Sequence, residues 1–302
     1  MLQINRNKFM KIDNRIQDII NAFIDTVDAQ FPGLFIDYYL CGSQMDQTAN
    51  DNSDIDLILV TEKSVAKEVE DAYGEIYKTF NRNNSLQIGA MVHELTDLKN
   101  LMAYEKSALH LKGENCFRNI PLYDIDSTIK QYIFGSLKFI GMFLRDRNSE
   151  LHLPVALPDP EAETEFYGYR FPDESFGPCC KRIVSAIARF CGALIALKWN
   201  KHPVSKRESI KVFAQLSSSR FVHWVVEVTE LMSKEWNYLL PVNIEDKARF
   251  LEILRTFNDF ENYFLEQVTP YINSCLEDDN GKEWVKECNT LVTFPNKSGE
   301  MD

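Results

Sequence analysis

Two aspartates one residue apart, Asp54 and Asp56, open an apolar run in the stretch CGSQMDQTANDNSDIDLILV (residues 41–60). Burying a carboxylate costs free energy unless a cation neutralises it. In a strand, the two side chains would point to one face about 7 Å apart, where they repel each other but can share a divalent cation. Because Mg²⁺ binds a few carboxylates together with substrate phosphate oxygens, this spacing indicates magnesium-dependent phosphate chemistry.

The turn before the aspartates has the residues of a phosphate-binding site. Gly42 and Ser43 follow a strand-like apolar run. A glycine lets a phosphate approach the backbone, a serine hydroxyl can donate to it, and unpaired N–H groups at such a turn favour anions. The alternative is a solvated loop in which Asp54 or Asp56 caps a turn. The aliphatic neighbours of Asp56 disfavour that alternative.

The elements around these residues predict a small α/β domain. Residues 14–30 place their large apolar side chains on one helical stripe, and strands are expected at 34–40, 54–60 and 85–95. Helices are expected at 64–80, with Ser64 as N-cap, and at 95–111. With a short helical turn after Ser43, the order becomes α-β-α-β-α-β-α, which is typical of an α/β domain.

After Asp124 the pattern becomes helical. Helices are expected at 127–147, 178–199, 206–217, 220–236 and 245–268. Between the first two lies an irregular, acidic segment, 148–176, which is long for a connection and is either a solvated loop or a lid over a substrate. The predicted fold is therefore α/β (or α+β): a mixed-sheet domain at 1–123, then an all-helical domain at 124–302.

The strand–Gly-Ser–Asp-x-Asp arrangement resembles the nucleotidyltransferase (DNA polymerase β-like) superfamily. Here it reads YYLCGSQMDQTANDNSDIDLILV, with ten residues between Ser43 and Asp54. In size and element order the chain is also similar to the antibiotic (aminoglycoside and lincosamide) adenylyltransferases, which add a C-terminal helical bundle. The segments PVSKRESIKVF (203–213) and KEWNYLLP (234–241) look like parts of that bundle.

This resemblance implies Mg²⁺-dependent transfer of a nucleoside monophosphate, expected to be AMP from ATP, to a hydroxyl of a small molecule. An aminoglycoside-like or lincosamide-like acceptor would make the function antibiotic resistance. Asp54 and Asp56 would bind the metal and act in catalysis. The residues implied for nucleotide binding are Gly42, Ser43, Ser53 and Lys206. For Lys206 the alternative is a helix start stabilised by the capping box of Ser205 and Glu208.

One position departs from the family pattern. The resemblance places a third catalytic carboxylate on the strand 85–95, at the position of Gln87, and glutamine cannot accept a proton. Glu94 does not replace it, because alternation along the strand puts Glu94 on the other face. The irregular segment offers further carboxylates that could reach the site. They are Glu161, Glu163, Glu165, Asp173 and Glu174.

Gln87 leaves two alternatives to the small-molecule enzyme. One is a catalytically weak nucleotide-binding protein with a regulatory role. The other is nucleotidyl transfer to a protein acceptor. A nucleic-acid acceptor is disfavoured because the net charge is −12 and no basic stripe is visible.

Composition bounds the remaining function classes. The 302 residues contain seven cysteines without a C-x-x-C pair, and five histidines without H-x-x-x-H spacing, so a disulfide framework or a zinc site is not expected. No apolar run approaches the ~20 residues of a membrane span, and the N-terminus lacks the apolar region of a signal peptide. The expectation is a cytoplasmic protein without a membrane partner.

Overall fold

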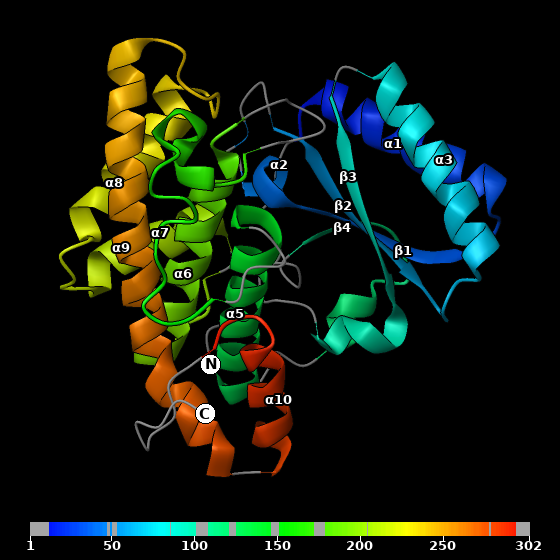
Figure 1. Ribbon diagram of the computed structural model, residues 1–302. Coiled ribbons are helices and arrows are strands. Elements are labelled where there is room, and N and C mark those ends of the chain that lie inside the picture. Colours follow the sequence, from blue (N-terminus) through cyan, green and yellow to red (C-terminus); the bar gives the residue numbers. More distant parts are fainter. Residues whose placement is uncertain are drawn as a thin grey trace. The chain divides into compact units, whose positions relative to one another are not determined.

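Figure 1 shows the computed structural model of the protein, which describes residues 12–46, 49, 53–84, 86–100, 108–120, 125–145, 151–171, 179–203, 205–277 and 279–293. The chain divides into two compact units, Met1–Tyr123 and Asp124–Asp302. Among the described residues, no helix is both long enough and apolar enough to cross a membrane.

In its described part, the first unit contains one four-stranded mixed sheet with helices on one face (Figure 1). The strands are β1 (Phe35–Cys41), β2 (Ile55–Thr61), β3 (Ile88–Glu94) and β4 (Leu109–Gly113). The helices are α1 (Asn14–Gln30), α2 (Gly42–Asp46) and α3 (Lys67–Asn83), with short 3₁₀ helices η1 (Leu95–Asn100) and η2 (Cys116–Asn119). The strand order is β3-β2-β1-β4.

The sheet buries both faces, and alternation along the strands decides which residue faces which layer. Leu57 of β2 packs in the cluster formed with α1 and α3, as do Tyr38 and Leu40 of β1. Ile58 of β2 packs on the opposite face against Tyr39 and the short helices η1 and η2. Asp54 and Asp56 share the parity of Ile58, so they belong to the face opposite α1 and α3.

The second unit is helical, and α5 to α9 lie side by side in Figure 1. Its α-helices are α5 (Ile125–Phe139), α6 (Lys181–Trp199), α7 (Lys206–Leu216), α8 (Val222–Glu230), α9 (Ile244–Ser274) and α10 (Asp279–Asn289). The shorter elements are the π-helices η3 (Ile140–Leu144) and η5 (Leu231–Glu235) and the 3₁₀ helices η4 (Glu163–Gly168) and η6 (Cys275–Glu277). Phe190 of α6 stacks on Phe264 of α9 at 4.5 Å between ring centroids in the centre of this unit.

The described part of the predicted irregular segment is anchored to the helices. Arg145, 3% exposed, forms a bidentate ion pair with the fully buried Glu261 of α9 (Nη2–Oε2 2.6 Å and Nε–Oε1 3.2 Å). The same guanidinium donates to the Ala156 carbonyl (2.7 Å), and Asn262 pairs with both backbone groups of Val155 (2.7 and 2.8 Å). Val155 is therefore fixed on α9, and Ala156 is held by Arg145 beside it.

The predicted elements are largely confirmed, with three corrections. Ser64 is not an N-cap: α3 begins at Lys67 behind Ala66, which makes no side-chain capping bond. The expected helix at 95–111 is wrong at both described ends, since 95–100 is a 3₁₀ helix and 109–113 is strand β4; residues 101–107 lie outside the described part. Pairing of β4 with β1 decided this region, not local propensity. Helix α10 was not expected.

Candidate active site

The candidate site lies at the sheet edge where β1 ends and β2 and β3 begin. Antiparallel pairing of β1 with β2 places Cys41 beside Asp56, and parallel pairing of β2 with β3 places Asp56 beside Gly89. Cys41, Asp56 and Gly89 therefore form one row across three strands, with their outward directions on the same face. Gly42 and Asp54 flank this row.

Asp56 lies between two glycines. A Cβ built on Gly42 would stand 2.0 Å from Asp56 Oδ2, and a Cβ built on Gly89 would stand 3.2 Å from Asp56 Oδ1. Gly42 also has φ +72°, in the left-handed region that side chains other than glycine rarely adopt. The sequence thus provides the space that the Asp56 carboxylate occupies, one oxygen against each glycine.

The two aspartates converge on the same point. The Cβ position of Gly89 lies 3.2 Å from Asp56 Oδ1 and 3.9 Å from Asp54 Oδ2. One oxygen of each carboxylate therefore faces the space above Gly89, as expected for a pair of ligands separated by one residue on a strand. The Gln44 amide donates to the Asp54 carbonyl (3.5 Å) and ties α2 to the start of β2.

The carboxylate oxygens of Asp54 and Asp56 are suitable ligands for Mg²⁺. This ion prefers a few carboxylate oxygens and leaves its other coordination positions to water and substrate phosphates. The space above Gly89, which a Cβ would fill, is an opening of the required kind. Among the described residues, no group of three or more His, Cys, Asp or Glu side chains could hold a metal. Any remaining ligands would come from water, from the substrate or from elsewhere in the chain.

Gln87 lies directly before β3, and its backbone carbonyl accepts from Ile55 N (2.8 Å). Its side-chain amide donates to the carbonyls of Asn81 (3.1 Å) and Asn84 (3.5 Å) at the end of α3. Asn81 in turn bonds both backbone groups of Ile88 through its side chain (2.8 and 2.9 Å). Gln87 is thus part of the α3–β3 connection in this structure, and its expected place at the acceptor stays a prediction.

The other sequence-predicted nucleotide-binding residues are divided between the units. Ser43 is half-buried in α2, and Ser53 is 5% exposed directly before Asp54. Lys206 belongs to the second unit, where its ammonium donates to Ser185 Oγ (3.1 Å). Ser205 caps α7 by accepting from Glu208 N (3.1 Å), as one half of the expected capping box.

Of the four aromatic side chains described at 166–171, three are core residues, and Phe166 is partly buried. Tyr167, Tyr169 and Phe171 are 1 to 5% exposed within the second unit. Among the candidate carboxylates, Glu163 pairs with Arg255 of α9 (2.8 Å). Asp173 and Glu174 lie outside the described residues.

A second polar cluster, which was not anticipated from the sequence, lies further along the same face of the sheet. The carboxylate of Asp37 is fully buried and accepts from His110 Nε2 (2.9 Å), Cys116 N (2.5 Å) and the Tyr39 hydroxyl. Burial, with a smaller contribution from Asp37, raises the pKa of the Cys116 thiol to about 12. These bonds join β4 and η2 to β1, so the cluster supports the sheet that carries the candidate site.

His93 lies on β3, the strand that follows Gln87, but far along it from the two aspartates. His93 pairs in register with Val60 near the far end of β3, whereas Gly89 pairs with Asp56 near its start. Burial lowers the pKa of His93, and its Nε2 atom is buried without a hydrogen-bond partner among the described residues. His93 is therefore neutral at physiological pH and does not complete the site.

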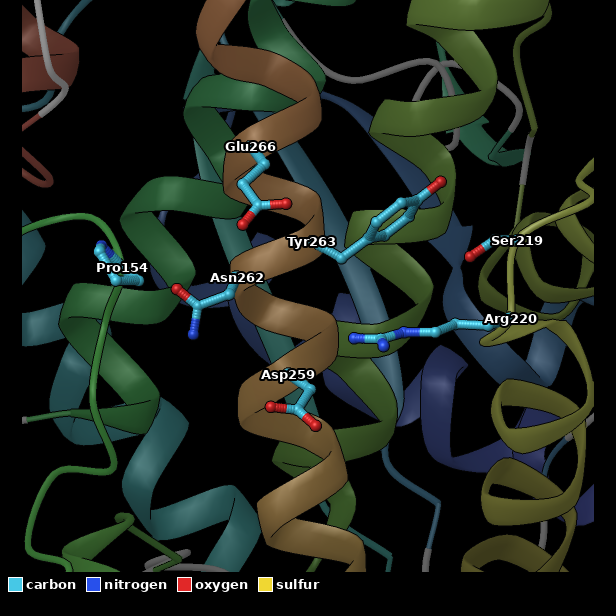
Figure 2. A pocket seen from close by; sticks show the side chains of 7 residues that line it. All are labelled: Pro154, Ser219, Arg220, Asp259, Asn262, Tyr263 and Glu266. Atoms are coloured by element: carbon cyan, nitrogen blue, oxygen red, sulfur yellow. The ribbon is translucent and has the colours of Figure 1, made fainter.

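The second unit has a polar groove of about 560 Å³ over α9. It is lined by Pro154, Ser219, Arg220, Asp259, Asn262, Tyr263 and Glu266. Figure 2 shows Asp259, Asn262 and Glu266 along α9, with Pro154 on one side and Arg220 on the other. None of the sequence-predicted site residues lines it. Its three charged side chains are exposed on the surface, so it provides no enclosed site.

Comparison with known proteins addresses the fold. No protein-family profile matches the sequence, and no characterised protein matches it in sequence. Among solved structures, the chain is similar to spectinomycin adenyltransferase AAD(9) from Enterococcus faecialis, determined with ATP and spectinomycin. The TM-score is 0.53 at 10% identity, over 81% of this chain and 98% of that one. The two proteins share a fold.

This similarity confirms the predicted fold class, a mixed sheet followed by a helical region. Sequence reasoning did not identify Gly89 as a site residue. A glycine inside a strand pattern is itself a signal of close approach by another group. Here that group is the Asp54–Asp56 pair.

Proposed function

We propose that the protein is a nucleotidyltransferase that transfers a nucleoside monophosphate, AMP from ATP, to a hydroxyl of a small molecule in a Mg²⁺-dependent reaction. The observation that carries this proposal is the convergence of Asp54 and Asp56 above Gly89, next to the Gly42 turn. The fold shared with an adenyltransferase that was solved with ATP supports it.

Asp54 and Asp56 would hold the metal, and their fixed spacing at the start of β2 would orient it. Gly42 and Ser43 would seat the triphosphate, since glycine leaves its backbone accessible and the serine hydroxyl can donate to a phosphate oxygen. When bound, Mg²⁺ would neutralise charge on the phosphates and on the leaving pyrophosphate. We include Ser53 and Lys206 as further nucleotide-binding residues.

In the proposed reaction the acceptor oxygen attacks the α-phosphorus in line with the leaving group. The bond from the α-phosphorus to the bridging oxygen breaks, pyrophosphate leaves with that electron pair, and the proton of the acceptor hydroxyl passes to solvent water. Positioning and electrostatics account for most of the rate in such reactions. An aminoglycoside-like or lincosamide-like antibiotic is the acceptor class that we propose.

The direct test is ATP labelled in the α-phosphate, incubated with Mg²⁺ and a panel of aminoglycosides, aminocyclitols and lincosamides. The proposal requires label in one of them and stoichiometric release of pyrophosphate. Asp54→Asn and Asp56→Asn should abolish transfer and retain the fold. Asp18→Asn, on the exposed surface of α1, is the matched control and should retain activity. Full activity in either site variant would refute the metal assignment.

Gln87 favours a second candidate, a protein that binds the nucleotide with a regulatory role and transfers it poorly or not at all. A glutamine amide cannot act as a general base, and this one donates to the carbonyls of Asn81 and Asn84. Mg²⁺-dependent binding of ATP, with no pyrophosphate release in the presence of any acceptor, would select this candidate. Label in proteins of a cell lysate would instead select a protein acceptor.

A further inference from the structure

The backbone conformation at position 89 does not require a glycine. Its φ lies outside the left-handed region, unlike the φ of Gly42 (+72°) and Gly113 (+109°) in the same unit. A glycine inside a strand weakens it, because the chain loses more entropy on folding and there is no side chain to pack. The reason for glycine at this position must therefore lie in the space above it.

That space is bounded by the two carboxylates. A Cβ at position 89 would lie 3.2 Å from Asp56 Oδ1, closer than ordinary van der Waals contact, and 3.9 Å from Asp54 Oδ2. A Cβ at Gly74, which lies in α3 of the same unit, would meet no described atom within 4 Å. At Gly89 the atoms that crowd the Cβ position are thus the carboxylate oxygens of the site, whereas Gly74 has room for a side chain.

The same two oxygens are those that a shared cation would bind. A methyl group there would push the Asp56 carboxylate by a few tenths of an ångström and would occupy space that a hydrated cation needs. The other oxygen of Asp56, Oδ2, lies 2.0 Å from where a Cβ of Gly42 would stand, so the carboxylate is packed closely against the Gly42 turn. A small displacement would therefore change the distance between the two ligand oxygens.

We propose that Gly89 is a positioning residue that keeps the space between the Asp54 and Asp56 carboxylates open for the divalent cation. This inference rests on the proposed nucleotidyl transfer, because the cation of that reaction is the one that the space would admit. Gly89 makes no bond to the metal. It acts by leaving the Asp56 carboxylate in place and the position above the strand free.

The test is Gly89→Ala, with Gly74→Ala as matched control, in the full chain. Mn²⁺ is the probe, and the electron paramagnetic resonance signal of free Mn²⁺ reports its binding without any turnover. Gly89→Ala should weaken Mn²⁺ binding by about 10- to 100-fold, the range found when residues that orient metal ligands are changed. Its melting temperature in EDTA should equal or exceed that of the wild type, since alanine suits a strand better than glycine. Gly74→Ala should bind Mn²⁺ like the wild type.

The outcomes separate this inference from the proposed function. If wild type and Gly89→Ala bind Mn²⁺ equally while Asp56→Asn does not, the role of Gly89 is refuted and the metal site stands. If the wild type binds no Mn²⁺, both the role of Gly89 and the metal site of the proposed function are refuted. If Gly89→Ala loses its fold, the glycine is a requirement of the strand, and the inference is also refuted.

Discussion

Gln87→Glu tests whether position 87 supports the α3–β3 connection or faces the acceptor. The amide of Gln87 donates to the carbonyls of Asn81 and Asn84. A glutamate has no hydrogen to donate at neutral pH, and its charge would face two carbonyl oxygens. A lost hydrogen bond costs about 0.5–1.5 kcal/mol, and an acceptor left without its donor raises this to about 1–3 kcal/mol. We expect the free energy of unfolding to fall by about that amount.

Urea denaturation followed by circular dichroism measures this change. Gln87→Leu removes the donor without adding charge and should lose about 1 kcal/mol. Gln17→Glu, where the amide pairs with Asn21 on the surface of α1 (2.9 Å), controls for the substitution itself and should change stability by less than about 0.5 kcal/mol.

Turnover of Gln87→Glu gives the second half of the test. A general base at the acceptor is typically worth about 10²- to 10⁴-fold in rate, so a catalytic position would produce a large gain. The structure predicts a loss of stability without such a gain. If the free energy of unfolding is unchanged and turnover rises by about 100-fold or more, Gln87 does not support the α3–β3 connection, and its position faces the acceptor.

Three further predictions concern single elements. Glu261→Gln should destabilise the protein by about 3–5 kcal/mol in urea denaturation, because it leaves Arg145 buried without its counter-ion; a change below 1 kcal/mol would contradict this. Gly42→Ala should cost at least 1–2 kcal/mol for the left-handed φ alone and should also displace Asp56, which Mn²⁺ binding would report. Burial lowers the pKa of His93 in the folded protein, so as the pH falls below about 6.5 the unfolded chain takes up this proton first and the free energy of unfolding should decrease. His93→Gln should make the free energy of unfolding less dependent on pH in this range. An unchanged dependence would show that other groups cause the decrease.

In the first unit, the local sequence pattern predicted some of the helices and strands but not all of them. The helix 14–30 and the first two strands followed from periodicity and composition, and Asp54 and Asp56 fell on one face because strand alternation is strict. The expected helix at 95–111 failed because β4 is formed by pairing with β1. That contact is distant in sequence, and no local signal of Leu109–Gly113 contains it.

The site was predictable in its residue types but not in its packing. The Asp-x-Asp spacing indicated the metal ligands, whereas the role of Gly89 depends on the register of β2 with β3. The buried Asp37 resembles Asp56 in sequence, as an acid within an apolar strand, yet its donors are on β4 and η2, which the sequence did not place. The irregular segment was expected to be a solvated loop or a lid, and only the structure showed that Tyr167, Tyr169 and Phe171 within it are buried core residues.

The central claim is that Asp54 and Asp56 together hold the metal that binds the nucleotide. Crystals grown with Mn²⁺ and a non-hydrolysable ATP analogue, measured for anomalous scattering from manganese, test it most directly. We expect a peak about 2.1 Å from an oxygen of each carboxylate, above Gly89, with triphosphate oxygens in the same coordination shell. A nucleotide bound elsewhere, or a metal that contacts neither carboxylate, would contradict it.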